Sequence, residues 1–327
     1  MSELLLARHA DCLFWLARYV ERAENLARIL DVNATFARDS KGAQEWLPIV
    51  QLHADTKRFV ARHTEASQET VLRFYVTDPE NPTSIVSALR NAHENARTLR
   101  PFISTEMWVQ LNVFYNRVRA FGEASLSPGR LSRLFELIKE GCQTHTGITE
   151  GTFFRDQGWY FYQIGRYLER ADQTTRLLDI KYHHLLPAPE AVGSPVDASQ
   201  WNALLRSAAG YYAYRRIHSS VFTPARVAGF MLLNPSFPRS VALCVRELGL
   251  LLTELKSRHG LRRGDRAAED LDALQALLGT LTIQQILIRG LHEFLDQIQR
   301  QLIAVNDHIT AAFFGRAPAS TGVQTQH

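Results

Sequence analysis

Apolar residues recur at steps of three and four along most of this chain, the spacing that places side chains on one face of an α-helix. The first long segment follows this spacing at Leu13, Leu16, Val20, Ala23, Ala27 and Leu30. Alternating apolar and polar positions, which would indicate a strand, are nearly absent. The ambiguous stretch at 70–77 (TVLRFYVT) is predicted to be a short helix. The pattern predicts an all-α fold.

Proline, glycine and serine divide the pattern into successive helices. The helices predicted before the middle of the chain span residues 84–100, 104–122 and about 129–154. The segments predicted after them are a helix ending near Leu186, a linker at 187–195 (PAPEAVGSP), amphipathic segments at 266–282 and 283–314, and a disordered tail at 317–327 (APASTGVQTQH). The tail has too few apolar residues to form a packed core.

One segment of the chain occurs twice. Residues 13–32 read LFWLARYVERAENLARILDV and residues 161–180 read FYQIGRYLERADQTTRLLDI, at a constant offset of 148. Farther on, Trp46 matches Trp201, and a proline-rich turn followed by a helix appears in both halves. The sequence therefore predicts an internally duplicated multi-helix bundle with two pseudo-symmetric Glu-Arg helices. We expect a single domain at 1–316, made of repeats at about 1–150 and 151–316.

A stripe of polar residues follows each repeated helix, because positions three and four apart lie on one side. The stripe contains Arg18, Glu21, Asn25 and Arg28, with Arg22 beside it, in the first copy, and Arg166, Glu169, Gln173 and Arg176, with Arg170 beside it, in the second. A pseudo-two-fold relation would place the stripes face to face. The residue four positions before each glutamate is small, Ala17 or Gly165, which predicts a close helix crossing.

Two interpretations of this Glu-Arg cluster stay open at the level of the sequence. In the structural interpretation, buried Arg-Glu pairs fix how the two halves dock and perform no chemistry. In the functional interpretation, surplus arginine leaves guanidinium groups without a carboxylate, and these bind a substrate carboxylate or phosphate. A carboxylate between guanidinium groups is expected to have a lowered pKa, which argues against a general acid at neutral pH.

Composition excludes several classes of function. The 327 residues have a net charge of +4 and are 46% hydrophobic and 21% charged, which is typical of a globular protein. Basic runs with interleaved aromatic residues are missing, so no nucleic-acid partner is expected. No run of 18 apolar residues and no signal-peptide pattern occur, so we expect no membrane span and a cytoplasmic location.

No motif indicates a metal, a cofactor or a known catalytic site. The three cysteines (12, 142 and 244) are far apart and lack the C-x-x-C spacing of a zinc or redox site. The Glu-x-x-His pairs of a di-iron bundle are missing. There is no glycine-rich phosphate loop and no G-x-S-x-G nucleophile elbow. We therefore expect neither metal nor cofactor.

Three motifs resemble those of the bacterial alpha-E family, an all-helical domain of unknown function named for its Glu-Arg motif. They are ADCLFWLARYVERAENLARILD (10–31), NPTSI…ENARTLRPFISTEMWVQLN (81–112) and RDQGWYFYQIGRYLERADQTTRLLD (155–179). The resemblance implies signature positions at Glu21, Arg22, Glu169 and Arg170. It implies a second tier at Glu94, Asn95, Arg97, Arg100, Trp108 and Asn112. The spacing of Trp108 and Asn112 suggests a core anchor with a capping partner more than a ligand shelf.

The resemblance also implies partners: ATP-grasp ligase-like proteins and transglutaminase-like peptidases encoded alongside the family. Our first hypothesis is accordingly an accessory or binding subunit of an ATP-grasp-type peptide or amide ligase, with no catalytic motif of its own. The alternative is an enzyme in which Glu21 or Glu169 is a general acid or base. The neighbouring arginines would then hold a peptide or an acidic small molecule. A self-assembling homo-oligomer is a third hypothesis.

Overall fold

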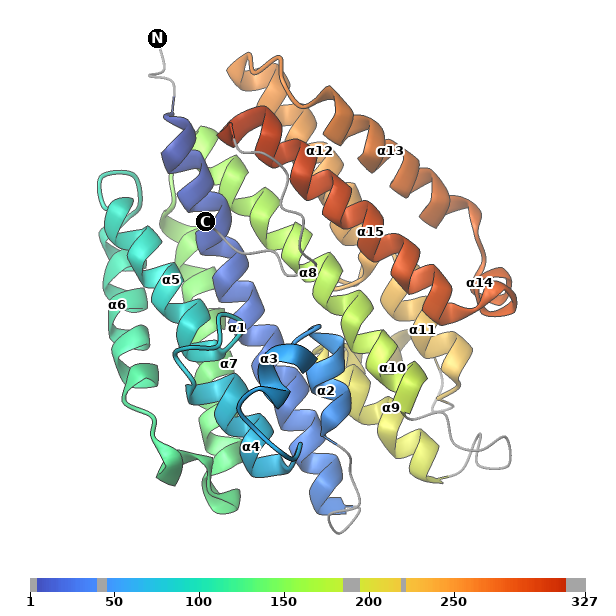
Figure 1. Cartoon of the computed structure of the whole chain (residues 1–327). Coiled ribbons are helices and arrows are strands. Elements are labelled where there is room, and N and C mark those ends of the chain that lie inside the picture. The colour runs from blue at the N-terminus through green and yellow to red at the C-terminus, as the bar shows by residue number, and fades with distance from the viewer. Residues whose placement is uncertain (1–4, 40–45, 185–194, 219–221, 316–327) are drawn as a thin grey trace.

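The computed structural model describes residues 5–39, 46–184, 195–218 and 222–315. Within these ranges the regular secondary structure is entirely helical, and no strand occurs (Figure 1). The all-α prediction is confirmed for this part of the chain. The predicted linker, apart from Pro195, and the predicted tail at 317–327 lie outside the described residues.

Two long helices run side by side through the middle of the bundle, α1 (Ala7–Asp39) and α8 (Gln157–His184) (Figure 1). Leu5 lies beside Gln157 at one end of this pair, and Phe14 lies beside Gly165 farther along. Residue numbers therefore increase in the same direction, so the two helices are parallel. Every residue of α1 from Ala10 to Glu24 is buried, which means that its polar stripe is buried as well as its apolar face.

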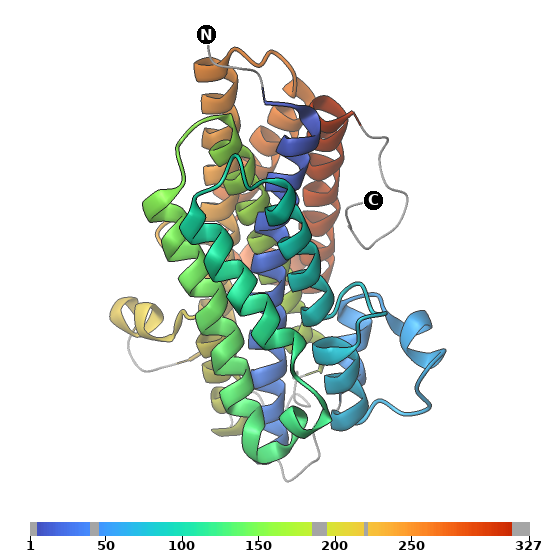
Figure 2. The ribbon, with the colours of Figure 1, turned by 90° about the vertical axis from the view of Figure 1, so that its left-hand side faces the viewer.

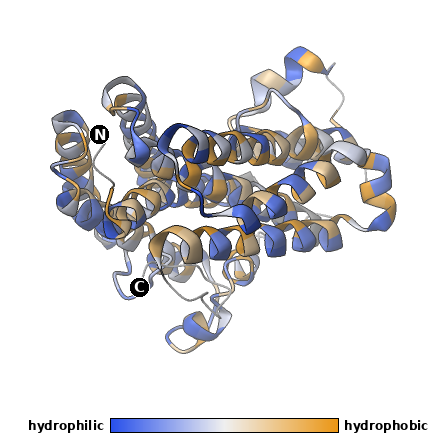
Figure 3. Ribbon diagram, turned by 90° about the horizontal axis from the view of Figure 1, so that it is seen from above, coloured by the Kyte–Doolittle hydropathy of each residue, from blue (hydrophilic) through white to orange (hydrophobic). Residues whose placement is uncertain are grey.

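Each central helix is covered by its own set of outer helices. Those around α1 are α5 (Ile85–Thr98) and α7 (Pro128–Thr152), with α6 (Thr105–Arg119) packed outside them. Those around α8 are α12 (Val241–His259) and α15 (Leu291–Ile309), with α13 (Asp265–Thr280) packed against both. Seen from above in Figure 3, apolar and polar residues alternate along most of the ribbon, as expected of amphipathic helices with one face in a core.

Shorter helices complete the molecule. They are α2 (Leu47–Leu52), α3 (Thr56–Val60), α4 (Gln68–Leu72), α9 (Pro195–Ser207), α10 (Tyr211–Ile217), α11 (Pro224–Leu233) and α14 (Ile283–Arg289). Figure 2 shows the corner at α2 and α3, in blue, projecting from one side of the bundle and α10, in yellow, from the other. The helix α2 contacts α8, and α10 follows α9, which contacts α1.

Serine caps explain where several helices begin. The side chains of Ser84, Ser104 and Ser240 accept hydrogen bonds from the backbone N–H groups three residues later, at the starts of α5, α6 and α12. Such a cap satisfies a donor that has no partner inside the helix. The helices predicted at 84–100 and 104–122 are confirmed, with ends that differ by one to three residues.

The structure divides one predicted segment and confirms another. The amphipathic segment predicted at 283–314 is helical, but it is divided at Gly290, where φ is 99°, into α14 and α15. Only glycine adopts such a φ readily. The stretch at 70–77 is helical, as predicted, and consists of the end of α4 and a π-helical turn at Arg73–Thr77.

Among the described residues, no single helix has both the length and the apolar composition of a membrane span. The pair α13 and α14 meets those two criteria only when taken together, and the two helices are bent by 102° relative to each other.

Candidate functional site

Glu169 is fully buried at the crossing of α1 and α8 and is held by two arginines from α1. Arg18 Nε donates to Glu169 Oε2 over 2.8 Å, and Arg22 donates to both carboxylate oxygens, over 2.6 and 3.0 Å. Burial would raise the pKa of Glu169, but the charges and hydrogen bonds of Arg22 and Arg18 outweigh it and lower the pKa to about 2. Glu169 is therefore ionised at neutral pH.

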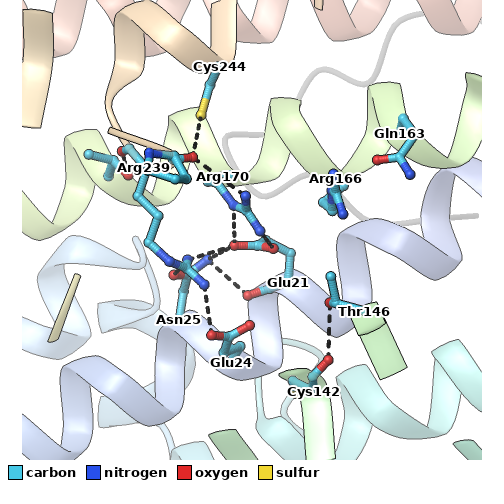
Figure 4. A network of polar contacts seen from close by, with 12 residues as sticks. Glu21, Glu24, Asn25, Cys142, Thr146, Gln163, Arg166, Arg170, Arg239 and Cys244 are labelled. Carbon is cyan, nitrogen blue, oxygen red and sulfur yellow. Dashed lines mark hydrogen bonds and ion pairs between the residues drawn. The ribbon is translucent and has the colours of Figure 1, made fainter. Parts of the chain in front are cut away.

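Glu21 occupies the corresponding position on α1, and Figure 4 shows Arg170 and Arg239 both directed at it. Arg170 of α8 binds the two carboxylate oxygens over 2.9 and 2.8 Å, and Arg239 Nη1 donates to Oε1 over 2.7 Å. Burial would raise the pKa of Glu21, but Arg170 and Arg239 hold it well below the ordinary range. Glu21 is also ionised.

The four signature residues form two crossed ion pairs. Arg22 of α1 binds Glu169 of α8, while Arg170 of α8 binds Glu21 of α1. The crossing is close because Gly165 has no side chain, and a Cβ at that position would lie 2.2 Å from the carbonyl oxygen of Phe14. The predicted close approach of a second backbone is confirmed at Gly165.

One further arginine on each central helix reaches the end of a short helix. Arg28 binds Glu24 over 2.6 Å and donates to the carbonyl oxygen of Ser207, the last residue of α9, over 3.1 Å. Arg176 binds Asp172 over 2.8 Å and donates to the carbonyl oxygen of Leu52, the last residue of α2, over 2.8 Å. These carbonyl groups have no partner within their own helices, so the arginines anchor α9 and α2.

The remaining stripe residues also belong to the network. Asn25 donates to the backbone oxygen of Glu21 over 2.9 Å, and Gln173 donates to Glu169 Oε1 over 3.2 Å. Arg166 binds neither of those glutamates; it binds Glu150 of α7 over 2.8 Å. The structure thus brings the ten predicted stripe residues together in one region of the two central helices.

The expectation that surplus arginines lack a carboxylate is wrong. Each of the six stripe arginines lies within 2.8 Å of a carboxylate oxygen. The carboxylates that complete these pairs, besides Glu21 and Glu169, are Glu24, Glu150 and Asp172. Every stripe guanidinium therefore has a carboxylate partner. Counting Arg239, seven arginines share five carboxylates, and Nε of Arg166 has no hydrogen-bond partner among the described residues.

These paired Glu-Arg dipeptides agree with the comparison to known families. The Alpha-E model, described as a predicted alpha-helical domain with a conserved ER motif, matches residues 5–314. The chain belongs to the Alpha-E family.

Three curated relatives of this Alpha-E chain are uncharacterized proteins, one from Mycobacterium bovis and two from strains of Mycobacterium tuberculosis. Each is 25% identical over 326 aligned residues, which cover 91% of this chain and 36% of the relative. The chain thus spans about a third of the length of the curated relatives it matches. No solved structure matches it.

Arg239 is a residue of this network that comparison of the two copies missed. It precedes Ser240, the N-cap of α12, and its guanidinium bridges three residues of α1: Glu21, Glu24 and Asn25. The position that corresponds to it in the first copy, at an offset of 156, is Thr83. Comparison of the two copies reveals only residues that both contain, so an arginine present in one copy gives no signal.

His53 lies next to the Glu169 side of the cluster, at the C-terminal end of α2. It is buried, its ring centre is 5.3 Å from that of Tyr75, and its Nε2 atom has no hydrogen-bond partner among the described residues. Burial, followed by the charges of Arg176 and Arg22, lowers the pKa of His53 to about 3. It is therefore uncharged at neutral pH and adds no charge to the cluster.

The second-tier residues do not join the Glu-Arg cluster as a group. Glu94 pairs with Arg97 on the exposed side of α5, and Trp108 packs between His93 and Arg100. Of the second tier only Asn95 is buried.

Asn112 also differs from its predicted role. Its Oδ1 lies 3.0 Å from Nε2 of His93, and it is inside α6 and not at a helix end. The predicted capping role of Asn112 is wrong.

No set of three or more histidine, cysteine, aspartate or glutamate side chains is placed to hold a metal ion within the described ranges. The three cysteines are free thiols and buried.

Proposed function

We propose that this Alpha-E chain is a non-catalytic binding or assembly subunit of an ATP-grasp-type system that forms a peptide or amide bond. In this proposal the Glu-Arg cluster holds the fold together. One observation supports this part of the proposal: Glu21 and Glu169 are buried, and each is held between two guanidinium groups. A carboxylate in that position stabilises a helix crossing and does not exchange protons.

The same observation argues against the alternative enzyme. A general acid needs a pKa near the working pH, whereas the pKa of Glu169 is about 2. At pH 7 only about one molecule in 10⁵ would have this carboxyl group protonated. Its oxygens are already bound by Arg18 and Arg22, so it is also a weak base.

The length of the relatives supports a role in association with other polypeptides. Nearly two thirds of each mycobacterial relative lies outside the region that matches this chain. A unit that forms part of a longer protein in one organism is expected to work beside the corresponding polypeptide in another. The resemblance to the family suggests a ligase-like protein for this role, and the three free, buried cysteines fit a reducing compartment such as the cytoplasm.

We also infer that the chain is an internal duplication whose halves dock about a pseudo-two-fold axis parallel to α1 and α8. The carbonyl groups bound by Arg176 and Arg28 belong to Leu52 and Ser207, which are separated by 155 residues. Ala54 and Ala209 have the same separation, and both have a φ of 55°. A left-handed φ is unusual for alanine, so its occurrence at matched positions supports a common origin.

Reconstitution tests the proposed function. An ATP-grasp ligase-like protein of the kind that the family resemblance implies is purified from the same organism, and ATP-dependent bond formation is measured with and without the chain. We expect full activity only in the mixture. A ligase that is fully active by itself would refute the subunit role.

The same assay separates the subunit from the enzyme. We expect Glu21→Gln and Glu169→Gln to leave product formation unchanged wherever the variant is still folded at the assay temperature. Loss of product in a variant with a normal far-UV circular dichroism spectrum and melting temperature would favour the enzyme.

A further inference from the structure

One end of the bundle, which we call the basic end, is formed by four segments that are far apart in sequence. They are the start of α1, the turn between α5 and α6, the turn between α7 and α8, and the loop between α12 and α13. Figures 1 and 2 both show these segments at the top of the molecule. The contacts that connect them are the His9 and Phe102 rings at 4.4 Å, Ser104 and Thr152 at 2.7 Å, and Tyr160 and Glu254 at 2.8 Å.

The basic end has a surplus of exposed arginine. Its exposed arginines are Arg8, Arg97, Arg100, Arg155, Arg258, Arg262, Arg263 and Arg266, against carboxylates at Glu94, Glu106, Asp156, Glu254 and Asp265. Within the described ranges only Arg97 and Arg258 pair with a carboxylate, on Glu94 and Glu254. Arg100 and Arg155 lie over the rings of Trp108 and Trp159, at 5.3 and 5.1 Å. Such contacts hold a guanidinium in place without neutralising its charge.

Exposed apolar side chains lie among these arginines. Phe154 is 78% exposed, Leu6 is 63% exposed and Phe102 is 38% exposed. Each is within two residues of an unpaired arginine: Arg155, Arg8 or Arg100. Aromatic and apolar groups combined with arginine are typical of the residues that dominate protein interfaces.

The ends of the family match indicate what covers this surface. The match starts at Leu5, whose backbone N–H binds Gln157 at the start of α8. It ends at Phe314, whose ring lies 5.4 Å from that of Phe14 and 5.6 Å from that of Phe161. Both boundaries are therefore at the basic end. The longer relatives have additional polypeptide outside the region that matches this chain, and a polypeptide joined at either end of the family match would begin beside this surface.

We propose that the basic end is the surface by which this chain docks on its protein partner, and that the matching face of the partner is acidic with apolar side chains at its centre. The proposal rests on the proposed function, because it places the ligase-like protein on this end. Opposite charges at the rim orient the two proteins and speed their association, while the apolar groups stabilise the complex. A lipid surface fits less well, because a domain that lies on lipid usually presents an amphipathic helix to it, and the basic end consists of turns.

Binding between the full chain and the purified ligase-like protein is the first test, measured by titration calorimetry. Arg8→Glu with Arg155→Glu changes the charge of the basic end. Its matched control is Arg130→Glu with Arg133→Glu, at the exposed start of α7 on the opposite end. Phe154→Ser removes the most exposed apolar group of the surface, and its control is Ile288→Ser on α14, where the isoleucine is 85% exposed.

We expect each basic-end variant to raise Kd by about tenfold or more and each control to stay within about twofold. Added salt should weaken binding of the unmodified chain. If the unmodified chain binds but the basic-end variants and their controls behave alike, the docking surface is wrong and the subunit role stands. If the ligase-like protein does not bind at all, the proposed function fails, and the surface needs a separate probe.

That probe is a short synthetic peptide of alternating glutamate and leucine, with a glutamine version as its control. The surface is supported if the unmodified chain binds the glutamate peptide, Arg8→Glu with Arg155→Glu abolishes this binding, and the opposite-end pair leaves it intact. Equal binding by both variant pairs overturns it. Phosphatidylserine vesicles complete the test, because tighter binding to vesicles than to peptide, lost in the basic-end variant, would assign the surface to lipid and overturn a protein partner.

Discussion

Glu169 is fully buried between Arg18 and Arg22, so solvent cannot take the place of a lost partner. We expect Glu169→Gln to lower the free energy of unfolding by about 3–5 kcal/mol, because two buried guanidinium groups would lose the carboxylate that binds them both. Urea unfolding measures this change. The control is Glu94→Gln, at a side chain 49% exposed, which should change the free energy by no more than about 0.5 kcal/mol. Equal small effects of both would contradict a structural role.

The low pKa of Glu169 also predicts how stability depends on pH. Its folded-state pKa of about 2 lies below the value of about 4.3 expected in the unfolded chain. The stability it contributes is therefore present above about pH 4.3 and is lost as the pH falls toward 2. We expect urea unfolding between pH 5 and pH 2 to show a shallower decline in Glu169→Gln than in the unmodified chain. A slope identical to that of the unmodified chain would argue against this contribution.

The pair of His292 and Asp179 gives stability the opposite dependence on pH. The hydrogen bond that His292 Nδ1 donates to Asp179 Oδ1, over 2.8 Å, raises the pKa of His292 above its usual value. The stability from this pair is present below the ordinary histidine pKa and is lost as the pH rises through the raised value. We expect Asp179→Asn to return the pKa of His292 toward about 6.5, measured by NMR titration of the imidazole. His53, buried elsewhere, should stay uncharged in both proteins, and an unchanged His292 would show that the pair does not form.

At the scale of helices, Gly165 sets the distance between α1 and α8. Gly165→Ala would place a methyl group 2.2 Å from the carbonyl oxygen of Phe14, so the helices must separate and the ion pairs across them must lengthen. We expect a loss of about 1–3 kcal/mol in thermal or urea unfolding. Gly147→Ala in α7 is the matched control, because nothing lies within 4 Å of its added Cβ. That change should stabilise the helix by up to about 1 kcal/mol, and a similar loss in both variants would contradict the close crossing.

The positions of most helices could be predicted because their signals are local. Ser84 and Ser104 cap the helices that follow them, and Pro101 ends one of them. The break at Gly290 gave no such signal, because glycine also occurs inside helices and a pattern of apolar residues does not report φ. Burial of α1 on all sides could not be predicted either, since it depends on helices from both halves of the chain.

The candidate site was predictable to the extent that it is repeated. The matched stripes identified Glu21 and Glu169 with the arginines beside them, and the structure brings these residues together. The partners Glu24, Asp172 and Arg239 were not singled out as partners, because pairing depends on side-chain reach in three dimensions. For the same reason the sequence suggested unpaired guanidinium groups where the structure has ion pairs.

At the scale of the whole molecule, the cluster connects distant parts of the chain. Arg239 binds Glu21 across 218 residues, and Arg18 donates to Asn306 across 288 residues. We therefore expect one cooperative unfolding transition. A variant that retains only Trp46 reports on the first half by fluorescence, and one that retains only Trp201 reports on the second. The midpoints of their unfolding transitions should coincide with the midpoint measured by far-UV circular dichroism. Two separate midpoints would show that the halves unfold independently.

The long reach of Arg18 to Asn306 has a consequence for synthesis of the protein on the ribosome. Of the described helices α1 emerges first, but the groups that bind its polar stripe come from α8, from Arg239 and from α15. At 5–20 residues per second, the 288 residues between Arg18 and Asn306 take on the order of tens of seconds to add. During that interval the most deeply buried helix of the finished protein has no completed surroundings. The nascent chain should therefore depend on chaperones, which would shield α1 until the last helix is made.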